Sequence, residues 1–231
     1  MRAVILSGGT YSYYGDPEFC RGFVDGADLI VAADSGGGAL LKLGIPKGTP
    51  TVIIGDMDSI DQADLASLRR LKKSGGDLEI IREPAEKDST DTELAFDVAL
   101  KKGADEIVIL GALGGRVDHA LANLSLLIRT KSENGKRRKK VEAKIVDEYQ
   151  EITLLDAGIK NRIEGDVGET VSLISLKGDA EGVITNDLKY PLSDAILAQF
   201  SPLGVSNVIS GADPWVLFKR GLLLLVRVKK V

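Results

Sequence analysis

The sequence predicts an α/β protein, in which a doubly wound, mostly parallel sheet with flanking helices precedes a smaller antiparallel β-sandwich domain. Three observations support this prediction. Apolar runs alternate with helical patterns over residues 1–150. Beyond that point helical periodicity largely disappears, and Gly, Pro, Asp and Asn interrupt short apolar runs every few residues. Stretches rich in Gly and Asp directly follow several of the N-terminal runs. We therefore expect an α/β domain over 1–150 and a β domain over 151–231.

Strands of the first domain are expected where short runs rich in Val, Ile and Leu have the length of buried parallel strands. These runs are Ala3–Leu6, Leu29–Ala33, Thr51–Ile54, Leu78–Ile81, Ile107–Leu110 and Lys144–Val146. Helices are expected between them, over 17–25, 38–43, 61–73, 92–102 and 118–130. Leu65, Leu68 and Leu71 have helical spacing in the third helix. Thr90 and Glu93 form a capping box, which predicts the start of the fourth.

Short strands are expected throughout the second domain, because its apolar runs are brief and closely punctuated. The runs are Ile152–Leu155, Thr170–Leu176, Val183–Ile184, Ile196–Phe200, Val205–Ile209, Trp215–Phe218 and Leu222–Val228. A sandwich or a partial barrel is typical of such a pattern. The domain boundary is expected between Asp147 and Ile159.

The composition excludes several classes of protein. The 231 residues carry a net charge of -4, which gives no general attraction to nucleic acid. No apolar run approaches the ~20 residues of a membrane-spanning helix. The single cysteine excludes an intrachain disulfide framework. We expect a cytoplasmic protein with no nucleic-acid or membrane partner. The basic run 136–140 has no interleaved aromatic residue, and we expect it to be a solvated loop.

The stretch 55–60, Gly-Asp-Met-Asp-Ser-Ile, follows the third predicted strand. Asp56 and Asp58 thus lie at the carboxyl end of a strand, where open α/β sheets bind ligands. Two carboxylates so close repel each other unless a cation lies between them. A divalent metal with a bound polyphosphate fits this requirement. The alternative is an acidic surface turn, and in either case Ser59 is the expected cap of the next helix.

Glycine-rich stretches end the first two predicted strands. Residues 7–10, Ser-Gly-Gly-Thr, allow close backbone approach to a ligand or form a plain tight turn. Asp34, Ser35 and Gly36 follow the second strand, where glycine N–H groups suit a nucleotide phosphate or ribose. Asp34 is a candidate for a ribose hydroxyl or a metal shell. The chain has neither G-x-x-x-x-G-K-[ST] nor G-x-G-x-x-G, so neither standard loop binds a nucleotide here.

The segment after the fourth strand adds two more carboxylates. Asp88 and Asp91 occur beside Lys87 at the start of the predicted helix. The capping box accounts for Thr90 and Glu93 but not for both of these aspartates. Near a metal, they would complete an oxygen-rich shell.

The segment after the fifth strand is suited to phosphate. Gly114 and Gly115 offer backbone donors, and Arg116 offers a guanidinium fork. Asp118 falls in the first turn of the following helix. His119 and Asn123 are four residues apart and share a helix face. His119 is the only histidine, and we expect it to position other groups rather than to act as a base.

These motifs should meet in one crevice at the carboxyl edge of the sheet. It would hold Arg116 and five aspartates, namely Asp34, Asp56, Asp58, Asp88 and Asp91. No Ser-His-Asp order is evident, and Cys20 is expected to pack within a helix. Carboxylates, a divalent cation and glycine-rich loops together favour phosphoryl or nucleotidyl-type transfer from a nucleoside triphosphate.

In chain order, the motifs Ala-Asp-Ser-Gly, Gly-Asp-Met-Asp-Ser, Asp-Ser-Thr-Asp-x-Glu, Gly-Gly-Arg-x-Asp-His, and Leu-Lys-Tyr-Pro-Leu before Ser-Asn resemble those of the thiamine pyrophosphokinase family. The resemblance covers nearly the whole chain. It implies an N-terminal α/β catalytic domain, a C-terminal β-sandwich and a homodimer that binds thiamine between subunits. It also implies transfer of the pyrophosphoryl group of ATP to the thiamine hydroxyl, which gives thiamine diphosphate and AMP.

The resemblance also implies roles for individual residues. Mg²⁺ would be held by Asp56, Asp58 and Asp91, and Asp88 would support that shell and the substrate hydroxyl. ATP would be bound by Asp34, Ser35, Gly36, Gly114, Gly115, Arg116, His119 and Asn123. Thiamine would be bound by Asp118 and, from the partner subunit, by Tyr190, Ser206 and Asn207.

Three positions depart from the family pattern. Gly38 replaces a common Asn, Asp187 replaces a usual Gly, and Val208 replaces a usual acidic residue. Three alternative functions stay open: a pyrophosphokinase for another alcohol such as a pterin, a non-catalytic nucleotide-sensing module, and a metal-dependent pyrophosphohydrolase.

Overall fold

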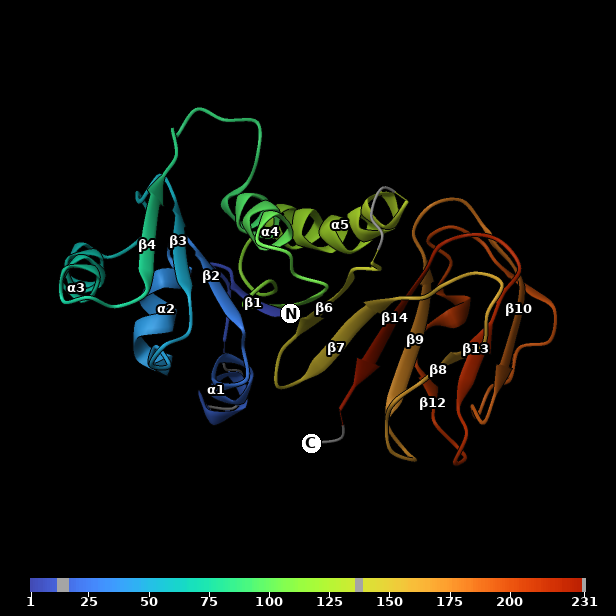
Figure 1. Ribbon diagram of the computed structural model, residues 1–231. Coiled ribbons are helices and arrows are strands. Elements are labelled where there is room, and N and C mark those ends of the chain that lie inside the picture. The colour runs from blue at the N-terminus through green and yellow to red at the C-terminus, as the bar shows by residue number, and fades with distance from the viewer. Residues whose placement is uncertain (12–16, 136–138, 230–231) are drawn as a thin grey trace. The chain divides into compact units, whose positions relative to one another are not determined.

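The computed structural model describes residues 1–11, 17–135 and 139–229 (Figure 1). The chain divides into two compact units, Met1–Glu148 and Tyr149–Val231. Lys136–Arg138 of the basic run lie outside the described residues. Lys139 and Lys140 are exposed and pair with acidic side chains. Among the described residues, no helix combines the length and apolarity needed to span a bilayer.

The first unit contains a parallel sheet of six strands. In chain order they are β1 Arg2–Leu6, β2 Leu29–Ala33, β3 Thr51–Gly55, β4 Leu78–Arg82, β5 Glu106–Leu110 and β6 Glu142–Val146. Their spatial order is β6-β5-β1-β2-β3-β4, and every one of these pairings is parallel. The order reverses direction between β1 and β5, which is the place where doubly wound sheets bind ligands.

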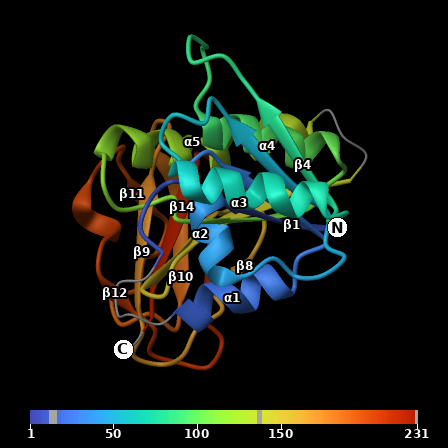
Figure 2. The same ribbon diagram turned by 90° about the vertical axis from the view of Figure 1, so that its left-hand side faces the viewer.

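Helices cover both faces of this sheet. They are α1 Pro17–Asp25, α2 Gly36–Leu43, α3 Gln62–Lys73, α4 Asp91–Lys101 and α5 Val117–Asn134. Helices α4 and α5 lie on one side of the strands, and α1 and α2 lie on the other (Figure 1 and Figure 2). Alternate residues of β1, such as Val4 and Leu6, share a core with side chains of α1, α2 and α3. This alternation follows from the period of two along a strand.

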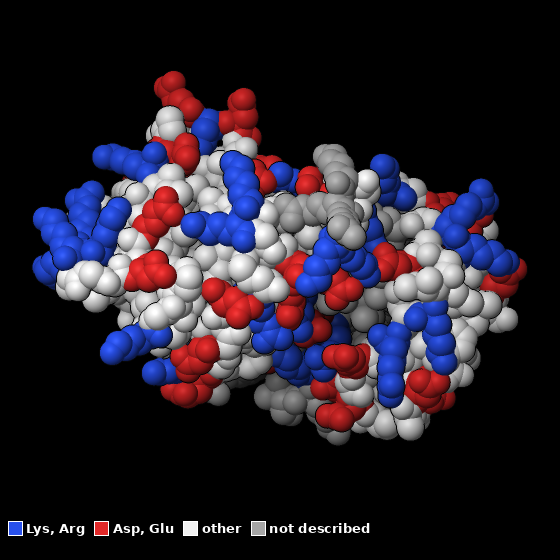
Figure 3. Space-filling model, in the orientation of Figure 1, with Lys and Arg blue, Asp and Glu red and all other residues white. Residues whose placement is uncertain are grey.

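Charged side chains are interspersed over the surface drawn in Figure 3. Basic residues gather over the last turn of α3, where Arg70, Lys72 and Lys73 occur. Cations at that position complement the partial negative charge of a helix C-terminus.

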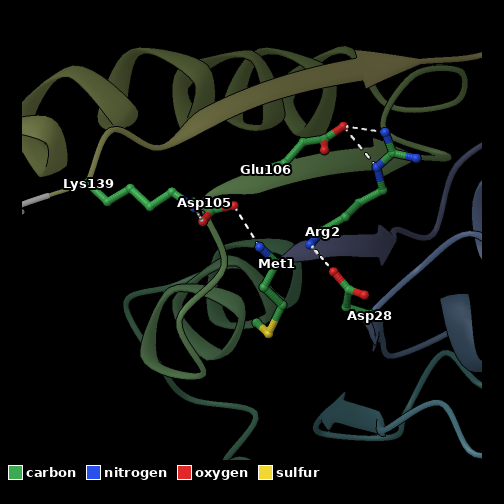
Figure 4. A network of polar contacts seen from close by, with 6 residues as sticks. All are labelled: Met1, Arg2, Asp28, Asp105, Glu106 and Lys139. Atoms are coloured by element: carbon green, nitrogen blue, oxygen red, sulfur yellow. Dashed lines mark hydrogen bonds and ion pairs between the residues drawn. The ribbon is translucent and has the colours of Figure 1, made fainter.

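A polar network ties the amino ends of β1 and β5 together (Figure 4). The N-terminal ammonium of Met1 lies 2.8 Å from Asp105 Oδ1, and Lys139 pairs with the same carboxylate. Arg2 Nε donates to Glu106 Oε1 at 2.9 Å. The hydrogen bond from Lys139, together with that from the N-terminus, lowers the pKa of Asp105 to about 2.

The second unit contains two antiparallel layers. Its elements are β7 Gln150–Leu154, β8 Asn161–Arg162, β9 Thr170–Ser175, β10 Ala180–Asn186, β11 Ala195–Leu197, the 3₁₀ helix η1 Pro202–Gly204, β12 Asn207–Val208, β13 Trp215–Leu217 and β14 Leu223–Val228. One layer has the order β12-β9-β14-β7, and the other has the order β11-β10-β13-β8. Val171 and Leu225 of the first layer share a core with Val183 and Val216 of the second. These layers confirm the predicted fold class.

The boundaries differ from the prediction in a few places. Helix α2 begins at Gly36, two residues early, and α5 continues to Asn134. Several apolar runs of the second unit contain only two or three strand residues, as at Asn207–Val208. Ser59 does not cap α3, contrary to expectation. Asp61 caps it, because its Oδ1 accepts from Ala63 N at 2.7 Å.

Candidate active site

The predicted motifs of the first unit converge at the carboxyl edge of its sheet. They follow β1, β2, β3 and β5 and include the first turns of α4 and α5. A pocket of about 350 Å³ opens there. Eight of the predicted site residues line it: Asp34, Ser35, Asp91, Gly114, Gly115, Arg116, His119 and Asn123.

Three carboxylates meet beside this pocket. Asp34, Asp56 and Asp91 each offer an oxygen, and these oxygens lie within 4.8 Å of one another. Asp34 is buried, with 6% of its surface exposed, and its Oδ2 accepts from Ser59 N at 3.2 Å. Its Oδ1 is also buried and has no hydrogen-bond partner among the described residues. Burial, followed by the neighbouring carboxylates of Asp91 and Asp56, raises the pKa of Asp34.

Asp56 belongs to this group, whereas Asp58 lies outside it. Asp56 Oδ1 accepts from the backbone N–H of Asp58 at 3.1 Å. That hydrogen bond, with the charge of Lys87, lowers the pKa of Asp56. Asp58 is exposed, and its Oδ1 accepts from Ser59 Oγ at 2.8 Å. The structure therefore places Asp34 with two of the three predicted magnesium ligands.

Gly55 makes this close approach possible. Its φ of +154° is a backbone conformation that other residues rarely adopt. A Cβ at position 55 would lie 3.0 Å from Asp34 Cβ and 3.1 Å from Asp91 Oδ1. Both distances are tighter than ordinary contacts of a Cβ, so a side chain here would push the two aspartates apart.

Lys87 is a site residue that has no predicted role. Its Nζ lies 2.9 Å from Asp91 Oδ1 and 3.6 Å from Asp56 Oδ2. Burial alone would lower the pKa of Lys87, but the two carboxylates outweigh burial and raise it. The signal available in the sequence was a basic residue directly before the acidic stretch 88–91.

The start of α4 has the predicted cap at Thr90, but one of its two predicted site aspartates, Asp88, does not join the other carboxylates. Thr90 Oγ1 accepts from Glu93 N at 3.2 Å and caps the helix. Glu93 Oε1 pairs with Arg129 of α5 at 3.2 Å, which links the two helices on that face. Asp88 is exposed and lies outside the group of three carboxylates.

The loop before α5 presents exposed charged groups. Arg116 Nε donates to Asp118 Oδ1 at 3.1 Å. This pairing lowers the pKa of Asp118 to about 2. Asn123 is buried, and its Nδ2 donates to Ala112 O at 2.9 Å, which anchors the loop from within α5. His119 is exposed, and its backbone N–H donates to Asp118 Oδ1 at 2.9 Å.

In the second unit, Asn207 fixes the backbone around Tyr190. Asn207 Oδ1 accepts from Tyr190 N at 3.0 Å, and its Nδ2 donates to Tyr190 O at 2.7 Å. Tyr190 itself is 58% exposed, and Lys189 Nζ lies 5.5 Å from its ring centroid. Ser206 is exposed, and its backbone N–H donates to Ser172 Oγ at 3.0 Å. The side chain of Asn207 thus makes its hydrogen bonds within the protein, whereas the side chain of Tyr190 is largely exposed.

Two of the three unusual positions have a structural explanation. Asp187 has a φ of +53°, a conformation that favours Gly but that Asp also tolerates. Its Oδ2 accepts from Asp213 N at 2.8 Å. Gly38 lines a second pocket of about 460 Å³, where a Cβ would lie 2.6 Å from Asp64 Oδ2. Nothing in the structure explains Val208.

Tyr11 and Cys20 also line this second pocket, and both are engaged within the protein. Cys20 is 2% exposed, and its Sγ donates to Tyr11 O at 3.2 Å. Tyr11 Oη donates to Ser7 O, and burial raises the pKa of Tyr11. These contacts agree with a packing role for Cys20.

Two family models match the chain, one for each unit. The first, described as "Thiamin pyrophosphokinase, catalytic domain", matches residues 20–138. The second, described as "Thiamin pyrophosphokinase, vitamin B1 binding domain", matches residues 159–223.

Individual relatives match most of the chain. Thiamine pyrophosphokinase from Bacillus subtilis (strain 168) is 30% identical over 223 residues, which cover 96% of each chain. Thiamine pyrophosphokinase 1 from Oryza sativa subsp. japonica is 26% identical over 84% of this chain and 76% of the relative.

Solved structures match the whole chain as well. The crystal structure of thiamine pyrophosphokinase from Bacillus subtilis has a TM-score of 0.79 and 29% identity, and the match covers 100% of both chains. That of thiamin pyrophosphokinase from Geobacillus thermodenitrificans has a TM-score of 0.78 and 30% identity, and the match covers 100% of this chain and 98% of the other.

Proposed function

This chain belongs to the thiamine pyrophosphokinase family, and on that premise we propose that it transfers the pyrophosphoryl group of ATP to the hydroxyl of thiamine. The products are thiamine diphosphate and AMP. The observation that supports the assignment best is the group of three carboxylates, Asp34, Asp56 and Asp91, beside a pocket lined by glycine-rich loops. Transfer from a nucleoside triphosphate requires such a cation site next to phosphate donors.

The residues present fit Mg²⁺. Carboxylate oxygens are the ligands that this cation prefers. The buried Asp34 Oδ1 has no hydrogen-bond partner among the described residues, which suits an oxygen that receives a cation. We propose that Asp34, Asp56 and Asp91 hold the ion and that Asp58, which lies outside this group in the structure, joins the shell when the ion binds. Magnesium would supply neutralising charge to the phosphates.

The remaining groups of this unit act on the phosphates and on the hydroxyl. Arg116 and the N–H groups of Gly114 and Gly115 bind ATP phosphate oxygens. The thiamine hydroxyl attacks the β-phosphorus in line, the bond between the α- and β-phosphates breaks, and AMP leaves. The hydroxyl proton passes to a carboxylate or to solvent. Asp88 and Asp118 are the candidate acceptors, and both are exposed.

Thiamine binding is assigned to the second unit of a partner subunit in a homodimer. Tyr190 is exposed, and its ring already attracts the ammonium of Lys189. A tyrosine ring attracts cations in general, and the cationic thiazolium of thiamine is one of them. Asn207 holds the backbone of Tyr190 in place, and Ser206 lies next to it in sequence. We expect the dimer to be cytoplasmic.

A single assay tests this function. Protein, ATP, Mg²⁺ and thiamine are mixed, and AMP and thiamine diphosphate are measured. We expect both products in equal amounts. AMP that forms without thiamine would identify a pyrophosphohydrolase, and AMP that requires a pterin alcohol would identify a different pyrophosphokinase. Absence of AMP under every condition would identify a nucleotide-sensing module.

The carboxylate group is tested by Asp34→Asn and Asp56→Asn. Each change keeps the side-chain volume but removes a negative charge that holds the cation. We expect turnover to fall by about 10²-fold or more, with little change in the melting temperature. Asp25→Asn is the matched control, because the one ion pair of Asp25 among the described residues is an exposed pair with Arg21 on α1. Near-normal turnover in both site variants would contradict the assignment.

A further inference from the structure

Lys87 lies among the same carboxylates that the proposed function assigns to magnesium. Its ammonium contacts Asp91 Oδ1 at 2.9 Å and Asp56 Oδ2 at 3.6 Å. The side chain is only 15% exposed, as is that of Asp56. Lys87 also precedes the cap of α4, Thr90, by three residues, so it approaches the site from the loop between β4 and α4. It is therefore part of the site and not a surface pair.

The ammonium and a divalent cation compete for these oxygens. Asp34, Asp56 and Asp91 provide three negative charges, and Lys87 neutralises one of them. A magnesium ion bound to Asp56 and Asp91 would lie close to the ammonium, and two cations at such a distance repel strongly. Magnesium can bind Asp56 Oδ2 and Asp91 Oδ1, the two oxygens that face the ammonium, only if the ammonium moves away.

We propose that Lys87 couples magnesium binding to nucleotide binding. Without nucleotide, its ammonium occupies Asp56 and Asp91 and weakens the binding of free magnesium. When magnesium arrives with ATP, the ammonium leaves the carboxylates and pairs with a phosphate oxygen of the nucleotide. A lysine suits this exchange because its compact charge sits on a flexible four-carbon chain.

The coupling follows from linkage. If nucleotide strengthens magnesium binding by displacing the ammonium, magnesium strengthens nucleotide binding by the same factor. Lys87 is then a positioning residue that favours entry of the metal–nucleotide complex over entry of either component alone. The inference rests on the proposed function for the identity of the nucleotide. Its core claim, competition between an ammonium and Mg²⁺, is independent of any reaction.

The test measures Mg²⁺ binding to the nucleotide-free protein by titration calorimetry. Lys87→Met removes the competing charge, and we expect it to bind Mg²⁺ about tenfold more tightly than the wild type. The matched control is Lys102→Met, which removes an exposed lysine whose ion pair, among the described residues, is with Glu79 of the same unit. The control should bind Mg²⁺ as the wild type does.

A second titration uses α,β-methylene ATP, in which a methylene group replaces the oxygen between the α- and β-phosphates, so that the nucleotide is not cleaved there. In the wild type the analogue should strengthen Mg²⁺ binding, and in Lys87→Met this strengthening should shrink by about tenfold. Lys87→Gln serves as a second variant if Lys87→Met folds poorly, as judged by its melting temperature. Unchanged or weaker Mg²⁺ binding in the folded variant overturns the proposal, even if the wild type converts thiamine as expected. A wild type that fails to produce AMP would instead contradict the proposed function.

Discussion

At the scale of the residue, the site depends on how closely three aspartates approach. The sequence places Asp56 and Asp91 in the site, because both occur in motifs at strand or helix ends. It does not show that Asp34 joins them while Asp58 is exposed and lies outside their group. That difference depends on the left-handed backbone of Asp34, with φ of +45°, and on the missing side chain at Gly55. The spacing and composition of the motifs predict neither this backbone angle nor the close contacts around Gly55.

Gly55→Ala tests this dependence on close approach. A methyl group at position 55 has to displace Asp34 or Asp91, and the backbone has to adopt a conformation unfavourable for alanine. We expect the free energy of unfolding to fall by about 1–3 kcal/mol and turnover to fall with it. Urea unfolding and the AMP assay provide the two measurements.

Gly48→Ala is the control for Gly55→Ala. Gly48 also has a positive φ, of +82°, but no atom lies within 4 Å of an added Cβ. The Gly48→Ala variant should lose only about 1 kcal/mol of unfolding free energy through backbone strain, and it should keep full turnover. Equal turnover in the two variants would show that the contacts of Gly55 are unimportant for the site.

At the scale of the element, strand positions follow closely from the sequence, and caps follow less closely. All six predicted strands of the first unit form. Val52–Ile54 in β3, for example, are apolar and buried on both faces, as in an inner strand of a parallel sheet. The cap of α4 at Thr90 is confirmed, whereas the cap of α3 is Asp61 instead of Ser59. Ser59 instead donates its backbone N–H to Asp34 and its hydroxyl to Asp58. Asp34 follows β2 and lies 25 residues earlier in the chain. The residues around Ser59 give no indication of this distant contact.

The network between β1 and β5 predicts a pH dependence of stability. The pKa of Asp105 falls from an ordinary value of 3.8 to about 2 in the folded protein, because Lys139 and the N-terminus bind the ionised carboxylate. A carboxyl whose pKa is lowered on folding stabilises the protein above its unfolded pKa. That contribution is lost as the pH falls from about 4 to 2.

Asp105→Asn removes the contribution at neutral pH. We expect the variant to be less stable than the wild type at pH 7, and we expect the difference to shrink below pH 4. Urea unfolding at a series of pH values measures it. Glu79→Gln is a control, because Glu79 makes one exposed pair with Lys102 and should contribute little at any pH. A difference that stays constant from pH 7 to pH 2 would rule out the linkage.

At the scale of the whole molecule, each unit matches a different family model, one for a catalytic domain and one for a vitamin B1 binding domain. The two-layer β unit and the α/β unit were both expected from the change in sequence periodicity near residue 150. The assembly of two chains was implied only by family resemblance. In the proposed dimer, no periodicity or motif tells which chain would supply Tyr190 to a site, because that would depend on surfaces that meet only after folding.

A complementation experiment tests the proposed shared site. Asp56→Asn affects the α/β unit, and Tyr190→Ala affects the β unit. If each thiamine site joins units from two subunits, a heterodimer of the two variants has one site with both changes and one with neither. We expect about half of the wild-type turnover, with a normal thiamine KM.

The heterodimer is isolated with two different affinity tags, and its KM is compared with those of both homodimers. Tyr190 is 58% exposed, so its replacement should leave the core of the β unit intact. A heterodimer with the raised KM of the Tyr190→Ala homodimer would place both halves of the site in one chain.

The burial of Cys20 has a practical consequence for studying how the chain unfolds. Cys20 is the only cysteine and lies in the first unit, at 2% exposure, whereas Trp215 is the only tryptophan and lies in the second. The rate of thiol labelling therefore reports openings around α1, and indole fluorescence reports the β unit. Each half of the unmodified protein carries its own probe. Comparing the two signals in urea would reveal whether the units melt together or one after the other.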